Sequence, residues 1–261
     1  MFMNTSFVIS PDGTRIAYDV TGEGSAIILL HGGWHTRQNW HDVGYVKRLK
    51  DNFKVIAIDI RGNGGSDKPT ESTYYTTEKM CQDILAVADA CGLEKFTIWG
   101  FSYGANIGRY LAAQSDQVEK LIIMGIPFGL GAPGDFRQFI EEFRNHWLPF
   151  LQAKSQGTLD ITSLSTEDQK AWQETNIAVD VAWLSAMLDW GVIEPADLRC
   201  QTLWLVGSKN ESTMASIREY EEKLKRSMVR VEVIEGLNHR EEFTEIDRSL
   251  PVMLAFMSNE V

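Results

Sequence analysis

The stretch Trp99-Gly100-Phe101-Ser102-Tyr103-Gly104-Ala105 decides the predicted fold, because it places a serine between two glycines that each lie two residues away. It follows an apolar run at residues 96–99 and precedes a helical pattern, which indicates a sharp strand-to-helix turn. In such a turn the backbones approach closely, so Gly100 and Gly104 must lack bulk. The hydroxyl of Ser102 would stand above a sheet at a helix N-terminus, where developing negative charge is stabilised. Ser102 is therefore the predicted nucleophile.

Apolar runs on both sides of this turn predict a mostly parallel sheet. Continuous apolar runs are typical of strands that are buried on both faces. Together with a later alternating segment, they predict strands at residues 26–30, 55–58, 96–99, 121–124, 203–206 and 229–234. Two short strands at residues 7–9 and 16–18 flank a turn and predict an antiparallel edge.

Helical patterns separate most of these strands. Residues 75–91 predict a crossover helix that Gly92 stops, and residues 214–225 and 246–257 predict two later helices. Alternation of strands with helices is typical of a sheet that is covered on both faces. The expected fold class is therefore α/β, with a doubly wound, mostly parallel sheet.

The strand pattern stops between residues 128 and 195, where Phe and Trp side chains recur among polar helical sequence. This segment predicts a helical cap inserted into a core formed by residues 1–127 and 196–261. For any single aromatic residue, packing inside the cap is the simpler interpretation. Taken together, these aromatics predict an apolar roof over a substrate pocket.

Composition and charge exclude several classes of protein. The hydrophobic fraction of the 261 residues is 44%, and no run approaches the roughly 18 consecutive apolar residues of a membrane span. A net charge of −11 disfavours nucleic-acid partners, which require basic patches.

Cys81, Cys91 and Cys200 are too few for a disulfide framework and are predicted to be buried thiols. The first residues carry no basic or apolar leader, so we expect a cytoplasmic protein of undetermined oligomeric state.

A second motif, His31-Gly32-Gly33-Trp34, directly follows the strand predicted at residues 26–30. A loop in this position can supply a backbone N–H to an oxyanion hole, which needs two donors. We assign one donor to Gly33 or its neighbour Trp34, and the other to Tyr103, which follows the nucleophile. A structural role in the loop is the preferred interpretation for His31.

These motifs together resemble the α/β-hydrolase superfamily. The loop at residues 31–34, the stretch Asp59-Ile60-Arg61-Gly62-Asn63-Gly64-Gly65-Ser66, the turn at Ser102 and a late histidine follow its order over nearly the whole chain. The chain is similar to the capped branch that contains small esterases, lactonases, cofactor-free haloperoxidase-like enzymes and carbon–carbon bond hydrolases. The resemblance implies that Arg61 and Asp67 belong to a fixed loop scaffold and have no catalytic role.

The resemblance also implies that His239 is the general base. This histidine lies in a turn between the last predicted strand and the final helix, and it follows Ser102 in the chain. The other four histidines lie in or just after the loop at residues 31–34, or in the predicted cap.

The acid of the triad is where the sequence departs from the family pattern. Related hydrolases have Gly-x-x-Asp after the strand predicted at residues 203–206, whereas this chain has Gly207-Ser208-Lys209-Asn210, followed by Glu211. A carboxylate fixes the imidazole tautomer and stabilises the imidazolium, whereas an amide supplies no charge. Chemistry therefore favours Glu211, while position in the sequence favours Asn210.

Three functions remain open at this stage. The first is hydrolysis of a small, mostly apolar ester, lactone or thioester through an acyl-enzyme, which requires no metal or organic cofactor. The second is hydrolysis of carbon–carbon bonds in diketone-like substrates on the same site. The third is a ligand-binding or sensory protein on a hydrolase scaffold, suggested by the amide of Asn210. The expected partner is a small molecule, and no nucleic-acid or membrane partner is expected.

Overall fold

The strands form a single eight-stranded sheet in the order β1-β2-β4-β3-β5-β6-β7-β8. The computed structural model describes residues 4–258, so part of the N-terminal stretch interpreted above as lacking a leader lies outside the described residues. The strands are β1 (Ser6–Ile9), β2 (Arg15–Thr21), β3 (Ser25–Leu30), β4 (Phe53–Ile58), β5 (Phe96–Phe101), β6 (Val118–Met124), β7 (Gln201–Gly207) and β8 (Val229–Ile234).

Strands β3 to β8 pair in parallel, while β1 and β2 are antiparallel. The predicted fold class is therefore confirmed, with each expected strand present. Strand β3 lies between β4 and β5, so the order of the strands reverses there. Ligands of open α/β sheets bind beyond the carboxyl ends of the strands at such a reversal. Leu30 pairs with Gly100 at this point, which brings the ends of β3 and β5 together.

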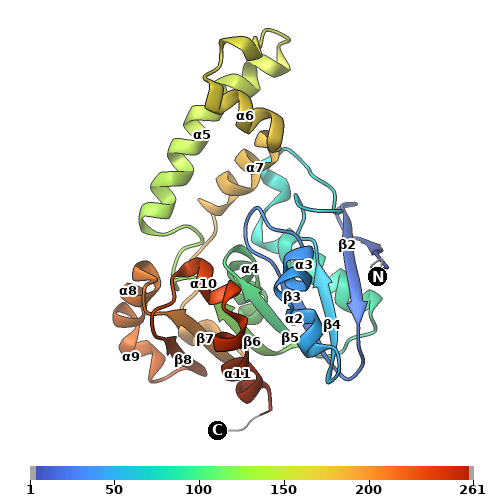
Figure 1. Cartoon of the computed structure of the whole chain (residues 1–261), viewed down its shortest axis with the longest axis vertical. Helices are drawn as coiled ribbons and strands as arrows, with labels where there is room; N and C mark the ends of the chain where they lie inside the picture. Colours follow the sequence, from blue (N-terminus) through green and yellow to red (C-terminus); the bar gives the residue numbers. More distant parts are fainter. Residues whose placement is uncertain (1–3, 259–261) are drawn as a thin grey trace.

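Two layers of helices cover the two faces of the sheet (Figure 1). One layer contains α3 (Thr77–Ala90) and α4 (Tyr103–Gln114), and a short 3-10 helix, η1 (Ser72–Tyr74), precedes α3. The other contains α1 (Gln38–Val43), α2 (Tyr45–Leu49), α10 (His239–Thr244) and α11 (Ile246–Met257). Helices α8 (Glu211–Glu219) and α9 (Glu221–Leu224) lie between β7 and β8 in the chain.

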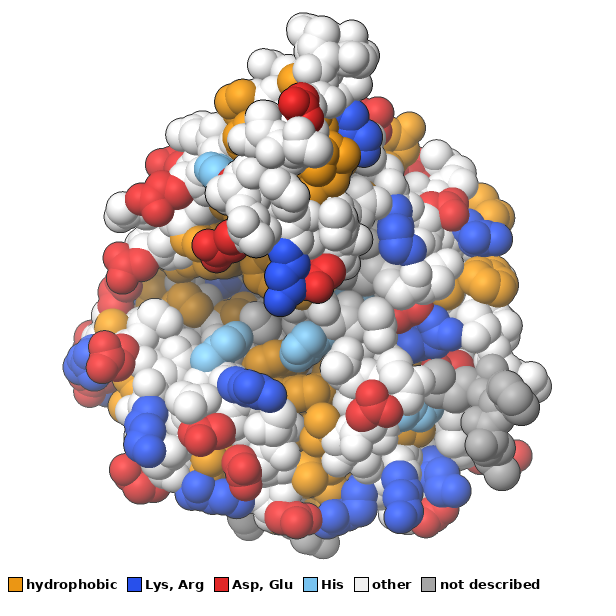
Figure 2. Space-filling view, turned by 45° about the horizontal axis from the view of Figure 1, so that its top comes forward, with side chains coloured by type: hydrophobic (Ala, Val, Ile, Leu, Met, Phe, Trp, Pro, Cys, Tyr) orange, Lys and Arg blue, Asp and Glu red, His pale blue; other side chains and the backbone are white. Residues whose placement is uncertain are grey.

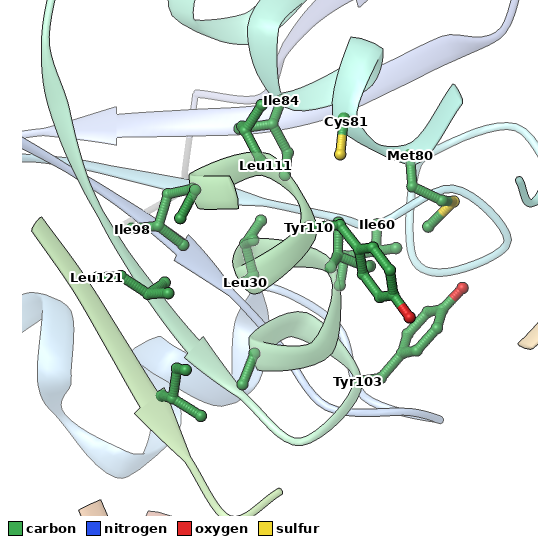
Figure 3. Close-up of a cluster of buried hydrophobic side chains, with 14 of the residues drawn as sticks. Leu30, Ile60, Met80, Cys81, Ile84, Ile98, Tyr103, Tyr110, Leu111 and Leu121 are labelled. Carbon is green, nitrogen blue, oxygen red and sulfur yellow. The ribbon is translucent and has the colours of Figure 1, made fainter. Parts of the chain in front are cut away.

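Alternation along the strands divides the core between these layers. In β3, Ile28 and Leu30 pack on the side of α3 and α4, whereas Ile27 and Leu29 pack on the opposite side. Figure 3 shows the first cluster, where Leu30 and other strand residues meet side chains of the helices such as Leu111. The position of α4, and of the turn that starts it, is therefore fixed by burial.

The segment between β6 and β7 carries α5 (Gly134–Ser155), α6 (Thr166–Glu174) and α7 (Ile177–Met187), together with the 3-10 helices η2 (Ile161–Ser163) and η3 (Pro195–Asp197). These α-helices stand at one end of the molecule, beyond the sheet (Figure 1). Some of their aromatics pack among themselves, as Trp147 does with Trp172. Others face the sheet, since Trp183 of α7 contacts Tyr103. Both interpretations of the aromatics therefore apply, each to different residues.

Within residues 4–258, no helix combines the length and the apolar character needed to cross a membrane. The three cysteines are free. Cys81 and Cys200 are buried as expected, whereas Cys91 at the end of α3 is only partly buried.

Candidate active site

The turn between β5 and α4 holds Ser102 in a rare backbone conformation. Its φ is 51° and its ψ is −115°, a region that residues with a side chain seldom occupy. The Ser102 N–H donates to Met124 O at 2.9 Å, and the Gly104 N–H donates to His31 O at 3.0 Å. A Cβ atom at Gly104 would collide with the backbone of Leu30, and one at Gly100 with the start of α4. The two glycines are therefore required by close contact, as the sequence predicted.

The structure brings Ser102 and His239 together. His239 is the first residue of α10, just after β8, and its Nε2 lies 3.2 Å from Ser102 Oγ. The imidazole stacks on Phe101 with ring centroids 5.0 Å apart, so its orientation is supported by packing. A hydroxyl within hydrogen-bond reach of an imidazole is the arrangement that activates a serine.

Tyr103, Gly33 and Trp34 line the same cavity as Ser102 and His239 and carry candidate backbone donors. Tyr103 is the first residue of α4, so its N–H has no acceptor within the helix. Gly33 and Trp34 lie in a turn after β3, and among the described residues their N–H groups donate to no backbone acceptor. Trp34 has a φ of 57°, and its ring contacts Trp183 at 5.1 Å between centroids. Within the described residues, the loop therefore has two N–H groups without a backbone acceptor, and Trp183 of α7 packs against it.

His31 has the structural role expected of it. It is fully buried, its Nδ1 lies 2.7 Å from Gly32 O, and its Nε2 accepts from the Ile60 N–H at 3.0 Å. Burial lowers the pKa of His31 from 6.5 to about 4, so its imidazole is neutral near pH 7. A neutral ring that donates from Nδ1 and accepts at Nε2 ties the loop to the segment after β4.

The stretch after β4 also forms a rigid scaffold. Arg61 is buried, and its guanidinium pairs with Asp83 at 2.5 Å and with Asp12 at 2.8 Å. The Asp67 carboxylate accepts from the Arg15 N–H at 2.8 Å. Arg61 and Asp67 do not line the cavity that contains Ser102, which agrees with the structural role that the resemblance implied.

The two candidates for the acid differ in their distance from the base. Asn210 is the N-cap of α8, where its Oδ1 accepts from the Thr213 N–H at 3.4 Å. Its Nδ2 lies 3.5 Å from His239 Nδ1. Glu211 is therefore the first residue of α8, exposed, and within residues 4–258 it makes no hydrogen bond or ion pair with His239. The Glu211 carboxylate, which chemistry favoured, is therefore not placed at the imidazole, because the cap at Asn210 fixes the start of the helix.

Sequence reasoning missed a third candidate, the carboxyl group of Glu242. This side chain is fully buried, and its Oε2 lies 3.7 Å from His239 Nδ1. Its Oε1 accepts from the Gly207 N–H at 2.6 Å and from Asn210 Nδ2 at 3.1 Å. The only carboxylate within 4 Å of the His239 imidazole nitrogens among the described residues thus comes from the helix that carries His239.

A capping signal in the sequence points to this arrangement. Asn238 and Glu241 form a capping box, which starts α10 at His239. Residues three apart on a helix face the same side, so Glu242 is placed beside the imidazole.

A cavity of about 970 Å³ lies over Ser102 and His239. Figure 2 shows a hollow on this face, with hydrophobic side chains inside it and histidine side chains at its lower edge. Its volume lies in the range of small-molecule sites. Most of its lining is apolar and includes Phe128, Phe136, Trp183 and Met187.

Arg109 adds a buried positive charge to the wall of this cavity. Its guanidinium donates to Pro127 O at 3.0 Å, to Leu130 O at 2.8 Å and to Asn106 Oδ1 at 2.9 Å. Burial lowers the pKa of Arg109. These bonds tie α4 to the segment after β6. Across the described part of the chain, no group of three or more His, Cys, Asp or Glu side chains is placed to hold a metal ion.

Comparison with known proteins agrees with the fold. A family model described as alpha/beta hydrolase fold matches residues 25–239, which is most of the chain. The chain therefore belongs to the α/β-hydrolase family.

Individual relatives carry different activities in their names. The chain is similar to a soluble epoxide hydrolase of Corynebacterium sp. (strain C12), with 33% identity over 125 residues, 48% of this chain and 42% of that protein. An epoxide hydrolase 4 of Mus musculus is 28% identical over 152 residues, 55% of this chain and 41% of that protein. The chain thus spans less than half the length of these two relatives. A thermophilic esterase from Thermogutta terrifontis has a similar structure, with a TM-score of 0.75, 19% identity and 98% of each chain covered.

The stability of the protein should depend on pH through His31. Because burial lowers its pKa from 6.5 to about 4, the unfolded chain binds the proton more readily than the folded protein. The stability that comes from the lowered pKa of His31 is fully present above pH 6.5 and is lost as the pH falls through 4. Between these values, the free energy of unfolding of the parental protein should fall by about 3 kcal/mol more than that of His31→Gln. Urea unfolding over a pH series measures this difference, and parallel curves would contradict it.

Proposed function

We propose that this protein is a serine hydrolase that cleaves a small, mostly apolar ester, lactone or thioester through an acyl-enzyme. The observation that carries the proposal is the 3.2 Å contact between Ser102 Oγ and His239 Nε2 at the floor of the cavity. It is supported by the free N–H groups of Tyr103 and of the loop at Gly33 and Trp34. A small molecule is the partner that a cavity of this size admits.

The proposed reaction has two halves. In the first, Ser102 Oγ attacks the carbonyl carbon while His239 Nε2 takes its proton, and the tetrahedral oxyanion accepts from Tyr103 and from Gly33 or Trp34. The intermediate collapses as His239 returns the proton to the leaving oxygen or sulfur. In the second half, His239 takes a proton from the water that attacks the acyl-enzyme, and it returns this proton to Ser102 Oγ as the bond to the acyl group breaks and the acid leaves.

The nucleophile favours an ester over an epoxide as substrate, although several relatives are named as epoxide hydrolases. A serine oxygen that opens an epoxide forms an ether, which has no carbonyl carbon for water to attack. A carboxylate nucleophile would instead form an ester that water can cleave. Because residue 102 is a serine, acyl transfer is the reaction that this site can complete.

We further propose that residues 128–195 act as a cap that selects the acyl group. Trp183 and Met187 of α7 line the cavity, and so does Phe136 of α5. Trp183 also packs against Gly33, where an added Cβ would lie 3.1 Å from its ring. The cap thus shapes the pocket and supports the oxyanion loop at once.

Removing the nucleophile or the base tests the central assignment. Ser102→Ala and His239→Ala should each reduce kcat by about 10⁴- to 10⁶-fold, because proton transfer and acyl-enzyme formation are both lost. Turnover of p-nitrophenyl esters and labelling by a fluorophosphonate probe measure the effect. Ser115→Ala, at the far end of α4, is the matched control and should keep parental rates. Near-parental turnover by Ser102→Ala would remove the proposal.

Shortening a cap residue tests the acyl pocket. Met187→Ala enlarges the cavity, so each methylene that the acyl chain gains there should raise the kcat/KM ratio of longer to shorter esters by about fourfold. Kinetics over a series of p-nitrophenyl esters of graded length provide the measurement. Met228→Ala is the control, because Met228 is exposed before β8 and lies outside the cavity lining. An unchanged preference, or a parental preference for charged or sugar esters, would argue against an apolar acyl pocket.

A further inference from the structure

A general base in this position needs a hydrogen-bond acceptor on its other nitrogen. For His239 Nε2 to take a proton from Ser102, the neutral ring must carry its own proton on Nδ1. An acceptor at Nδ1 fixes this tautomer, and a negative charge there stabilises the imidazolium that forms. Two side chains face Nδ1: Asn210 at 3.5 Å and Glu242 at 3.7 Å.

Asn210 presents a donor to the ring, and its neighbours fix that orientation. Its Oδ1 accepts from the Thr213 N–H at 3.4 Å and from Ser212 Oγ at 3.2 Å. Its Nδ2 donates to Gly125 O at 3.3 Å and to Glu242 Oε1 at 3.1 Å. A flipped amide would set oxygen against these two acceptors and nitrogen against the Thr213 N–H. The Asn210 amide nitrogen faces His239 Nδ1 as a donor, so it cannot accept a hydrogen bond from an Nδ1–H.

Glu242 presents an acceptor that is otherwise unused. Its Oε1 is held by the Gly207 N–H and by Asn210, whereas its Oε2 is buried and has no hydrogen-bond partner. A buried carboxylate oxygen without a partner is costly unless another group completes it. The nearest candidate is the Nδ1–H of His239, and catalytic hydrogen bonds of this kind are often long until substrate binds.

Gly125 leaves the space in which the two groups meet. It follows β6 with a φ of 78°, and an added Cβ would collide with Glu242 Oε2 and would lie 2.7 Å from His239 Nδ1. A side chain at position 125 would separate the carboxylate from the ring. Because residue 125 is a glycine, no side chain at this position lies between the Glu242 carboxylate and the His239 imidazole.

We propose that Glu242 is the positioning carboxylate of the triad, acting through His239, and that Asn210 holds Glu242 in place. This inference rests on the proposed function, because Glu242 gives His239 its orientation and countercharge as the general base. The carboxylate thus reaches the base from within α10 instead of from the loop after β7.

The variant Glu242→Gln tests this role with little change in shape. The amide can still accept from the Gly207 N–H, so circular dichroism and the melting temperature should show a folded protein. We expect kcat on p-nitrophenyl esters and the rate of fluorophosphonate labelling to fall by roughly 10³- to 10⁴-fold. Glu235→Gln is the control, because it removes an exposed carboxylate before α10 and should leave both rates unchanged. A folded Glu242→Gln protein with parental rates would overturn the proposal.

Moving the carboxylate separates a role in catalysis from a role in structure. In the double variant Asn210→Asp/Glu242→Gln, a carboxylate returns to a position that contacts Nδ1, so both rates should recover at least tenfold over Glu242→Gln. A purely structural role for Glu242 would give no such rescue, and its absence in a folded double variant would contradict the proposal.

The single variant Asn210→Asp decides the matter even if Glu242→Gln does not fold. With Glu242 present, a second carboxylate would lie against the first, and like charges at this distance repel. Parental or reduced rates support Glu242, whereas an increased rate would show that the site had lacked an acid and would overturn it. A parental protein that neither labels with the probe nor cleaves esters would instead remove the proposed function, and the inference with it.

Discussion

The active site depends on one strained turn, in which Ser102 adopts a positive φ between β5 and α4. Such a conformation costs about 1–3 kcal/mol and persists only where its surroundings determine it. Here the Ser102 N–H is bonded to the end of β6, and the Gly104 N–H to the loop after β3. Ser102, the proposed nucleophile, is thereby tied to the ends of both neighbouring strands, which are followed by the proposed oxyanion loop and by Gly125. These bonds fix the position of Ser102 relative to the loop after β3 and to Gly125.

One short helix, α10, carries both His239 and the carboxyl group proposed to act on it. Glu242 and His239 lie on one short helix, so the capping box that starts α10 positions the imidazole and its carboxylate together. The same carboxylate is bonded to the end of β7 through Gly207. A buried charge that lacks such donors would be unstable, and here two N–H groups satisfy its Oε1. The amide at position 210, which suggested an impaired triad, therefore serves as one of these donors.

Local patterns in the sequence were sufficient to predict the fold and to single out Ser102 and His239, which the structure brings together. Buried strands need apolar runs, and the turn at Ser102 needs glycines at fixed spacing, so both can be recognised from neighbouring residues. The proposed acid, Glu242, could not be found in this way, because its contact with His239 depends on how α10 packs against β7 and on the cap at Asn210. The capping box was visible, but whether Glu242 would be buried or exposed depends on tertiary packing. For the same reason, the sequence could not tell which cap aromatics pack together, as Trp147 does, and which line the cavity, as Trp183 does.

The role of Ser102 as nucleophile can be tested by identifying the atom that carries the acyl group during turnover. The reaction with p-nitrophenyl acetate would be quenched with acid in the steady state, and the peptides analysed by mass spectrometry. If Ser102 is the nucleophile, the acetyl group should be found on the serine of the peptide that contains it, and this peptide should carry none in Ser102→Ala. Hydrolysis that proceeds with the acetyl group on another residue would rule out this role.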